Sequence, residues 1–209
     1  MADAKPQCRL YLQVPAPLTA KLDAQLTQAL AQVAPACVLL CDNGQASEKV
    51  PADRMIDLVQ GAGVACLIEN DFVGAEDLGA DGVHIPADSD LYARARTRLG
   101  ESANIGVGCG LDRHGAMALA EAGADYIAFG VEAGTIDHFD QYTDFVAWWS
   151  EIFVVPCVAW NVGTVAHAEQ LAALGADFIA PPPTIWQSDS ALAMITDIDK
   201  AIRGARRAA

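Results

Sequence analysis

Basic residues are scarce in this sequence. Its 209 residues include 13 lysines and arginines against 27 aspartates and glutamates, which gives a formal net charge of −14. No lysine occurs between Lys49 and Lys200. Because affinity for nucleic acids comes largely from Lys and Arg side chains that neutralise phosphates, the composition argues against a nucleic-acid partner.

Long apolar runs are also absent. No segment approaches the roughly 20 uninterrupted apolar residues of a membrane-spanning helix, so we expect no membrane partner. The first residues, Met1-Ala2-Asp3-Ala4-Lys5, lack the apolar core of a secretion signal. We therefore expect a cytoplasmic protein.

No Cys-x-x-Cys motif is present among the six cysteines. Cys37 and Cys41 share one face of an expected strand, which is compatible with metal ligation. No histidine pair supports such a site. In a reducing compartment we expect the cysteines to be small buried hydrophobes.

A short motif recurs three times, as Gly79-Ala80-Asp81, Gly123-Ala124-Asp125 and Gly175-Ala176-Asp177. Each copy follows an Ala-rich stretch and precedes an apolar run. Glycine adopts the left-handed conformation at a helix C-terminus without steric cost, so each copy predicts a helix, a tight turn and a buried strand. Parallel strands need such helical crossovers.

Strand-like and helix-like stretches alternate through eight cycles, which predicts a single (β/α)8 TIM barrel spanning residues 1–209. No Gly-x-Gly-x-x-Gly turn follows the first strand, which argues against an open dinucleotide-binding sheet. The expected strands lie near 8–14, 37–42, 65–70, 82–86, 104–109, 126–131, 154–160 and 178–181. The expected helices lie near 18–33, 51–62, 73–79, 91–100, 113–122, 142–151, 164–174 and 189–207.

In barrels of this kind the chemistry takes place where the strands end and the following loops begin. The Gly-Ala-Asp turns fall at the opposite rim, so we expect Asp81, Asp125 and Asp177 to be structural. The residues after the strands are the candidates for function.

Several segments resemble the thiamine phosphate synthase and thiazole tautomerase family, in family order. They include Leu67-Ile68-Glu69-Asn70-Asp71, Leu78-Gly79-Ala80-Asp81-Gly82-Val83-His84-Ile85, Ile105-Gly106-Val107 and Ala122-Gly123-Ala124-Asp125-Tyr126-Ile127-Ala128-Phe129-Gly130. The likeness covers nearly the whole chain and identifies it as a diverged member.

The resemblance implies a role in thiamine biosynthesis: a transferase that joins a pyrimidine methyl diphosphate to a thiazole phosphate and releases pyrophosphate. Such chemistry needs Mg²⁺ and cationic side chains around the leaving group. Family members carry Asn-Asp after the third strand, here Asn70 and Asp71, with the aspartate as a Mg²⁺ ligand. A second acidic ligand is expected near Ser89, where Asp88 and Asp90 are available. The alternative interpretation makes Asp88 and Asp90 helix caps.

The chain departs from the family pattern at the charged positions. Where family members end strand two with Gln-x-Arg-x-Lys, this sequence has Leu39, Cys41 and Asn43. The histidine of the tautomerase branch is replaced by Gly110, and His114 lies one turn further on.

The loops after strands six to eight depart as well. Thr135 is retained, but no lysine follows it. Trp160-Asn161-Val162-Gly163 stands where the resemblance implies Gly-Gly, so Trp160, Asn161 and Gly163 are candidate ligand-contacting residues. Pro181, Pro182 and Pro183 have no backbone N–H to offer a phosphate.

Several aromatic or titratable groups have alternative roles. His84 is a candidate substrate-contacting residue, and a hydrogen-bonded structural histidine is the favoured alternative. Trp148 and Trp149 have the helical spacing of core residues, while a homodimer contact is the alternative. Trp160 and Trp186 together are compatible with an apolar pocket for an uncharged or cationic molecule.

Two functional hypotheses follow. The first is a synthase-type transferase that uses Mg²⁺ at Asp71 with Asp88 or Asp90. The second is a catalytically silent barrel that binds a small molecule or a protein partner. The loss of the cationic positions favours the second, since the site residues, and not the fold, decide function.

Overall fold

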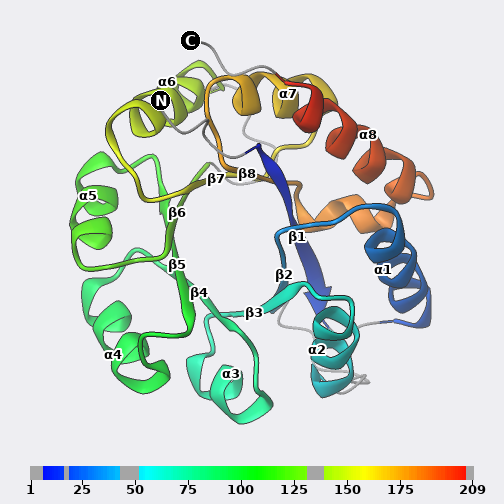
Figure 1. Ribbon diagram of the computed structural model, residues 1–209, viewed down its shortest axis with the longest axis horizontal. Coiled ribbons are helices and arrows are strands. Elements are labelled where there is room, and N and C mark those ends of the chain that lie inside the picture. Colours follow the sequence, from blue (N-terminus) through cyan, green and yellow to red (C-terminus); the bar gives the residue numbers. More distant parts are fainter. Residues whose placement is uncertain (1–6, 17–18, 43–51, 131–138, 206–209) are drawn as a thin grey trace, which may run out of the picture.

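The strands and helices alternate along the chain and close into one barrel. The structure is a computed structural model that describes residues 7–16, 19–42, 52–130 and 139–205. All neighbouring strands pair in parallel, in chain order, and the last pairs with the first. Figure 1 shows the helices as an outer ring around the strands. The predicted (β/α)8 barrel is confirmed.

The strands are β1 (Arg9–Ala16), β2 (Cys37–Asp42), β3 (Ala65–Glu69), β4 (Gly82–Pro86), β5 (Asn104–Gly110), β6 (Tyr126–Phe129), β7 (Cys157–Trp160) and β8 (Phe178–Ala180). The α-helices are α1 (Ala20–Gln32), α2 (Ala52–Gly61), α3 (Phe72–Leu78), α4 (Ser89–Leu99), α5 (Arg113–Glu121), α6 (Phe139–Ile152), α7 (Val165–Ala173) and α8 (Ala191–Gly204). A 3-10 helix, η2 (Pro183–Gln187), follows β8.

One strand begins later than the sequence predicts. We expected a strand from about residue 154, but β7 begins at Cys157. Val154 is 98% exposed, and Pro156 has no N–H for a strand ladder. The carbonyl of Pro156 still accepts a hydrogen bond from the Ile127 amide at 3.0 Å.

Alternate strand residues separate two cores, because side chains point to opposite faces of a strand. Outward-facing residues such as Leu10, Val83 and Ile127 pack against the helices in the larger cluster. The inward-facing cluster is smaller and contains Tyr11, Cys37, Cys41 and Tyr126. Leu39, Leu67 and Val158 also belong to it. The barrel interior therefore combines the branched aliphatic residues typical of this fold with aromatic and weakly polar ones.

The Gly-Ala-Asp turns have the predicted structure. Gly79 ends α3 in the left-handed conformation, with φ of 68°. Asp81 accepts a hydrogen bond from the Cys66 amide at 2.7 Å, and Asp125 accepts one from the Ile105 amide at 2.7 Å. Asp177 accepts one from the Cys157 amide at 2.9 Å. Each carboxylate thus ties the turn before one strand to the start of its neighbour.

The tryptophans of α6 belong to the core. Trp149 is fully buried and donates its indole N–H to the Val155 carbonyl at 2.7 Å. Trp148 is half-buried, and the Arg113 guanidinium lies 4.6 Å from the centre of its ring. The homodimer stays a prediction. Among the described residues, no helix combines the length and the apolarity that crossing a membrane requires.

Candidate functional site

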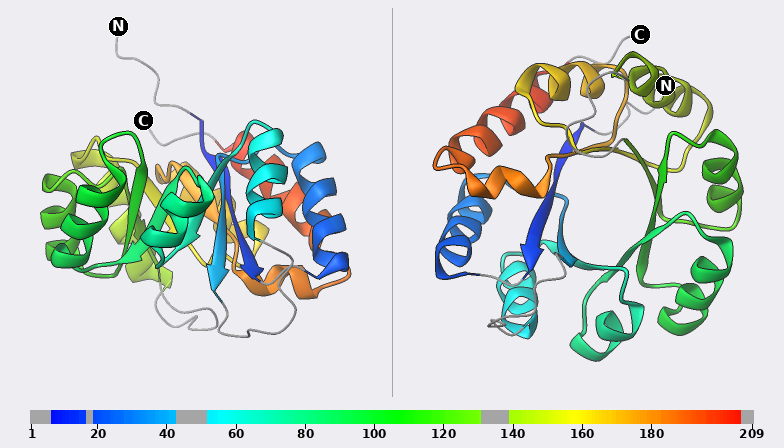
Figure 2. Two further views of the ribbon diagram at one scale, coloured as in Figure 1. Left: turned by 90° about the horizontal axis from the view of Figure 1, so that it is seen from below. Right: turned by 180° about the vertical axis from the view of Figure 1, so that it is seen from behind.

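The C-terminal ends of all eight strands lie at one end of the barrel, seen side-on in Figure 2, left. We call the inward and rim residues Gln13, Cys41, Glu69, Asn70, Trp160 and Asn161 the C-terminal mouth. Asn70 and Asn161 follow β3 and β7, and both have φ of 58°. Among described non-glycine residues, only these two have positive φ. Such conformations are uncommon and tend to occur at functional sites.

Gln13 joins three strand ends of the mouth. This inward-facing side chain of β1 is 4% exposed. Its amide nitrogen donates to Asn161 Oδ1 at 3.2 Å and to the Pro181 carbonyl at 3.0 Å. The backbone carbonyl of Gln13 accepts from the indole N–H of Trp186 at 2.7 Å. We did not single out Gln13 from the sequence, although a lone amide within the apolar run Leu10-Tyr11-Leu12-Gln13-Val14 was a usable signal.

The apolar-pocket hypothesis requires Trp160 and Trp186 to line one pocket, but Trp186 does not face the mouth. It is a residue of η2, is 4% exposed and packs in the outer core. Trp160 is half-buried at the end of β7. Of the two tryptophans, only Trp160 offers ring surface to a ligand at the mouth.

Four aromatic rings, those of Trp160, His84, Tyr126 and Tyr11, contact one another in the barrel interior. The rings of His84 and Trp160 are stacked, with centroids 4.5 Å apart and planes at 13°. His84 Nδ1 lies 3.0 Å from the Tyr126 hydroxyl, which lies 2.7 Å from the Tyr11 hydroxyl. Tyr11 also meets Trp160 edge to face. Trp160 therefore forms the floor of the mouth and rests on a hydrogen-bonded column.

Two glycines on β5 make room for this column. A Cβ at Gly106 would lie 1.8 Å from an atom of the Tyr126 ring, and a Cβ at Gly108 would lie 3.1 Å from His84 Nε2. The first distance is a direct clash, so Gly106 allows Tyr126 to point inward. The second places His84 Nε2 against the backbone of β5.

His84 is held uncharged by its surroundings. The side chain is 6% exposed, and burial lowers its pKa from 6.5 to about 3. Near neutral pH it therefore cannot supply positive charge to an anionic ligand. The sequence named it as a candidate substrate contact, and the structure places it beneath Trp160, with the partners of a structural histidine.

Cys41 occupies the position where the family pattern has arginine. Its side chain is 7% exposed and faces the interior. Burial, and next the nearby Glu69 carboxylate, raise the pKa of the thiol well above its ordinary value. A neutral thiol provides no attraction for a diphosphate, and the neighbouring Glu69 carboxylate repels it. Leu39, at the preceding family position, is fully buried, and Asn43 lies outside the described residues.

The candidate magnesium ligands begin helices. Asp71 caps α3 by accepting from the Gly74 amide at 2.8 Å, and Asp88 caps α4 by accepting from the Leu91 amide at 2.8 Å. Asp90 is exposed in the first turn of α4. The cap role expected as the alternative for Asp88 is thus present, whereas Asp90 lies in the first turn. Within the described ranges, no group of three or more His, Cys, Asp or Glu side chains is arranged to hold a metal.

The lysines and arginines in the described part of the chain lie on the outer helices or at the start of β1, and none is among the residues of the mouth. On the outer helices are Lys21, Arg54, Arg94, Arg96, Arg98, Arg113, Lys200 and Arg203. Arg9 begins β1 at the opposite end and donates to the Pro35 carbonyl. Arg113 packs on Phe145 and Trp148 of α6, as expected for an outer residue.

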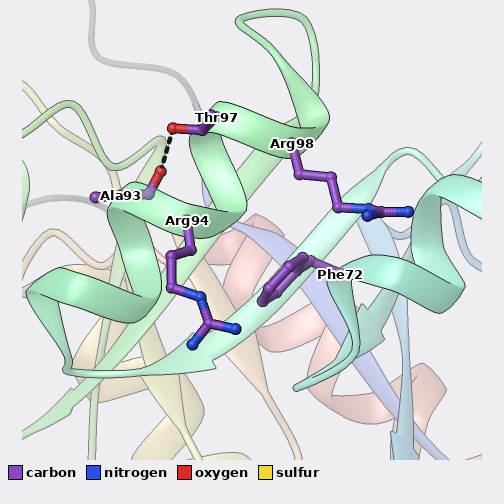
Figure 3. A pocket seen from close by; sticks show the side chains of 5 residues that line it. All are labelled: Phe72, Ala93, Arg94, Thr97 and Arg98. Carbon is purple, nitrogen blue, oxygen red and sulfur yellow. Dashed lines mark hydrogen bonds between the residues drawn. The ribbon is translucent and has the colours of Figure 1, made fainter.

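Figure 3 shows two of these cations, Arg94 and Arg98, on a shallow groove between α3 and α4 that Phe72 also lines. Arg98 pairs with Glu76 at 2.7 Å. Arg94 lies over the Phe72 ring, 5.8 Å from its centre. These guanidinium groups are thus part of the outer wall.

The remaining predicted site residues have separate positions. Gly163 is exposed just before α7, with open space around it. Thr135 lies outside the described residues. Pro181 presents a carbonyl to Gln13, and Pro182 and Pro183 begin η2. The mouth therefore brings together Asn70, Trp160 and Asn161 with the unpredicted Gln13 and Glu69.

Comparisons with known proteins agree on one family. A family model described as thiamine monophosphate synthase matches residues 10–182. A thiamine-phosphate synthase of Rhodospirillum centenum is 34% identical over 204 residues, covering 94% of this chain and 99% of that protein. Another, of Erythrobacter litoralis, is 40% identical over 136 residues, covering 63% of this chain and 64% of that protein.

Solved structures share the fold. A thiamine phosphate pyrophosphorylase from Pyrococcus furiosus superposes with a TM-score of 0.72 at 15% identity, covering 94% of this chain and 96% of that one. A Mycobacterium tuberculosis tryptophan synthase gives 0.73 at 12% identity, covering 94% and 93%. At such identities the likeness establishes the barrel fold alone.

Proposed function

This chain belongs to the thiamine monophosphate synthase family, and we propose that it binds a small planar molecule at the C-terminal mouth without carrying out the family's coupling reaction. The single observation that carries this proposal is Cys41, a buried and neutral thiol beside Glu69 where the family pattern has arginine. The family reaction releases pyrophosphate, whose developing charge needs cations placed in advance.

The surrounding charges support the same conclusion. In the described ranges, the lysines and arginines lie on outer helices or at the opposite end of the barrel. His84 is uncharged near neutral pH. The prolines after β8 remove N–H donors from a segment that binds phosphate in many barrels of this kind.

The groups that remain suit an uncharged or cationic planar ligand. Trp160 has one ring face stacked on His84 and keeps part of its surface exposed. An indole ring attracts both flat rings and cations through its π face. Asn161, held by Gln13, and Asn70 add amide groups for hydrogen bonds at the rim.

A second candidate function is the synthase reaction itself. It is favoured by the names of the relatives and by Asn70-Asp71 at the family position after β3. In that case Asp71, with Asp88 or Asp90, would hold the Mg²⁺ that accompanies the diphosphate. Mg²⁺ is usually bound by one or two carboxylates together with substrate phosphates. The capping hydrogen bonds of Asp71 and Asp88 count against this assignment.

An activity assay separates the two candidates. The purified protein is mixed with hydroxymethylpyrimidine diphosphate, thiazole phosphate and Mg²⁺, and thiamine phosphate is measured. We expect no product above background. The Rhodospirillum centenum relative, assayed in parallel, is the positive control. Robust turnover by this chain would contradict the proposal and establish the second candidate.

Calorimetry with pyrophosphate and Mg²⁺ tests the electrostatic argument without turnover. We expect no heat of binding from the wild-type protein. Tight binding of pyrophosphate would show that groups outside the described residues provide the cations, and it would overturn the proposal even if the coupling assay were negative.

A further inference from the structure

A second hollow lies at the opposite end of the barrel from the C-terminal mouth. It has a volume of about 120 Å³ and is lined by residues at or near the starts of the strands. We call it the N-terminal hollow. The lining residues used below are Tyr11, Cys37, Ala65, Asn104, Tyr126 and Phe178.

Small side chains explain why the hollow exists. The first inward-facing residues of β2 and β3 are Cys37 and Ala65, which pair with each other and both line the hollow. Barrels of this fold mostly fill such positions with bulky branched residues. Here two neighbouring strands carry small side chains, which leave the hollow between the larger rings of Tyr11, Tyr126 and Phe178.

Aromatic rings form much of the wall. Tyr11 and Tyr126 are 1% and 7% exposed and meet edge to face. Phe178 begins β8 at the rim and is partly exposed, as is Ala65. The hollow is thus closed on the barrel side and open at the rim, so a molecule can enter from solvent without passing the C-terminal mouth.

The polar groups of the floor are neutral. Burial raises the pKa of both tyrosines and of the Cys37 thiol well above their ordinary values. The charged groups that act on Cys37 are Arg9 and Asp81, which have opposite signs. A charged ligand would therefore meet no net charge at the floor, and burying an unpaired charge is costly. The occupant that fits is therefore uncharged.

The Tyr11 hydroxyl provides a hydrogen-bonding group. It bonds to the Tyr126 hydroxyl, which bonds to His84 Nδ1, and it lies within hydrogen-bond reach of the Cys37 thiol. A neutral imidazole nitrogen can be donor or acceptor according to its tautomer. The hydrogen bonds from Tyr11 to Tyr126 and His84 can therefore run in either direction. The Tyr11 hydroxyl can accordingly donate to a ligand or accept from one.

We propose that the N-terminal hollow is a binding site for an uncharged single-ring aromatic molecule that carries one hydroxyl or amino group, with the ring between Tyr11, Tyr126 and Phe178 and the polar group at the Tyr11 hydroxyl. An apolar cavity of roughly 150 Å³ binds benzene in another protein. The N-terminal hollow is smaller, at about 120 Å³, so part of a bound ring would extend through its open rim. This site is independent of the ligand proposed for the C-terminal mouth.

Phenol and toluene are the probes, and their binding to the full-length protein is measured by ligand-observed NMR titration. We expect phenol to bind the wild type in the millimolar range or better. Ala65→Leu and Cys37→Leu, which each fill the hollow, should weaken phenol binding at least about tenfold, the effect of losing 1.4 kcal/mol. Ala118→Leu, the same enlargement on the exposed face of α5, should leave it unchanged.

Tyr11→Phe tests the polar contact, because it keeps the ring and removes only the hydroxyl. It should weaken phenol binding several-fold and leave toluene binding unchanged, as expected for the loss of one hydrogen bond. Circular dichroism establishes that each variant is folded.

Three outcomes would overturn the proposal. One is the absence of phenol binding to the wild type, and another is equal binding by a folded filling variant. The third is a Tyr11→Phe variant that binds phenol as tightly as the wild type does. If neither filling variant folds, intermolecular NOEs between phenol and the Tyr11 and Phe178 rings decide the matter in the wild type, and their absence counts against the site.

Discussion

At the scale of single residues, the titratable groups inside the barrel are neutral, whereas the family pattern has charged side chains at the end of β2. Cys41 is a protonated thiol, His84 is a neutral imidazole, and Tyr11 and Tyr126 are protonated phenols. Each is neutral chiefly because burial disfavours its charged form. The column therefore resembles a packed core with internal hydrogen bonds more than a site built to hold a polyanion.

His84 should make the stability of the protein depend on pH. Its pKa is about 3 when folded and 6.5 when exposed, so between these values the unfolded chain binds a proton that the folded chain does not. The free energy of unfolding should therefore fall as the pH falls from 6.5 towards 3, by up to about 1.4 kcal/mol per pH unit from this residue. Urea unfolding at a series of pH values measures this slope.

The comparison protein for this experiment is His84→Gln, in which the carboxylates that also titrate at low pH are unchanged. The difference between the two stability curves isolates the histidine. A wild type and a variant that lose stability in parallel from pH 6.5 downward would show that His84 is protonated within the fold.

At the scale of secondary structure, carboxylates fix where elements begin. Asp71 and Asp88 accept hydrogen bonds at the starts of α3 and α4. Asp81, Asp125 and Asp177 tie the starts of β4, β6 and β8 to the preceding strands. Backbone N–H groups at such ends have no partner within their own element, so each carboxylate satisfies a donor that would otherwise be left open.

The Asp177 contact should be important for stability. Its carboxylate is only partly exposed and accepts from the Cys157 amide at the start of β7. Asp177→Ala should lower the free energy of unfolding by about 1–3 kcal/mol, because it leaves a buried donor without its acceptor. Urea denaturation measures the change.

The matched control is Asp189→Ala, which removes a carboxylate that is 100% exposed in its pair with Lys21. Such pairs are usually worth little. A cost for Asp177→Ala no greater than that of the control would argue against the structural role assigned to the Gly-Ala-Asp turns.

At the scale of the whole molecule, one fold carries two chemically different ends. The N-terminal end contains the three Gly-Ala-Asp turns and the N-terminal hollow. The other end carries the mouth, where Gln13 and Asn161 join β1 to β7. Membership of the family describes the scaffold that the ends share, whereas function depends on the groups placed at each end.

The net charge of −14 should make folding sensitive to ionic strength. Repulsion among the acidic side chains opposes the compact state, and salt screens it. Salt also weakens ion pairs, but pairs such as Arg98–Glu76 and Lys200–Asp197 have exposed partners and contribute at most about 1 kcal/mol each. We therefore expect the midpoint of urea unfolding to rise when NaCl is increased from low to physiological concentration. A midpoint that falls would mean that the ion pairs outweigh the repulsion.

The amino-acid sequence by itself determined the barrel, because its signals are local. A helix that stops at Gly79, or a run such as Tyr126–Phe129, is specified by residues within a few positions of each other. The absence of basic residues along β2 and after β6 could also be seen without coordinates, because the sequence alone states which residue types stand at those positions.

Only the tertiary structure decided the content of the two ends. The bond from Gln13 to Asn161 joins residues 148 positions apart, and the neutrality of His84 depends on what Trp160 and Tyr126 cover. Asp71 and Asp88 look like metal ligands in the sequence and cap helices in the structure. Burial and long-range contacts arise when distant segments meet, and the order of residues does not state them, which is why the hollow beside Tyr11 had no trace in the sequence pattern.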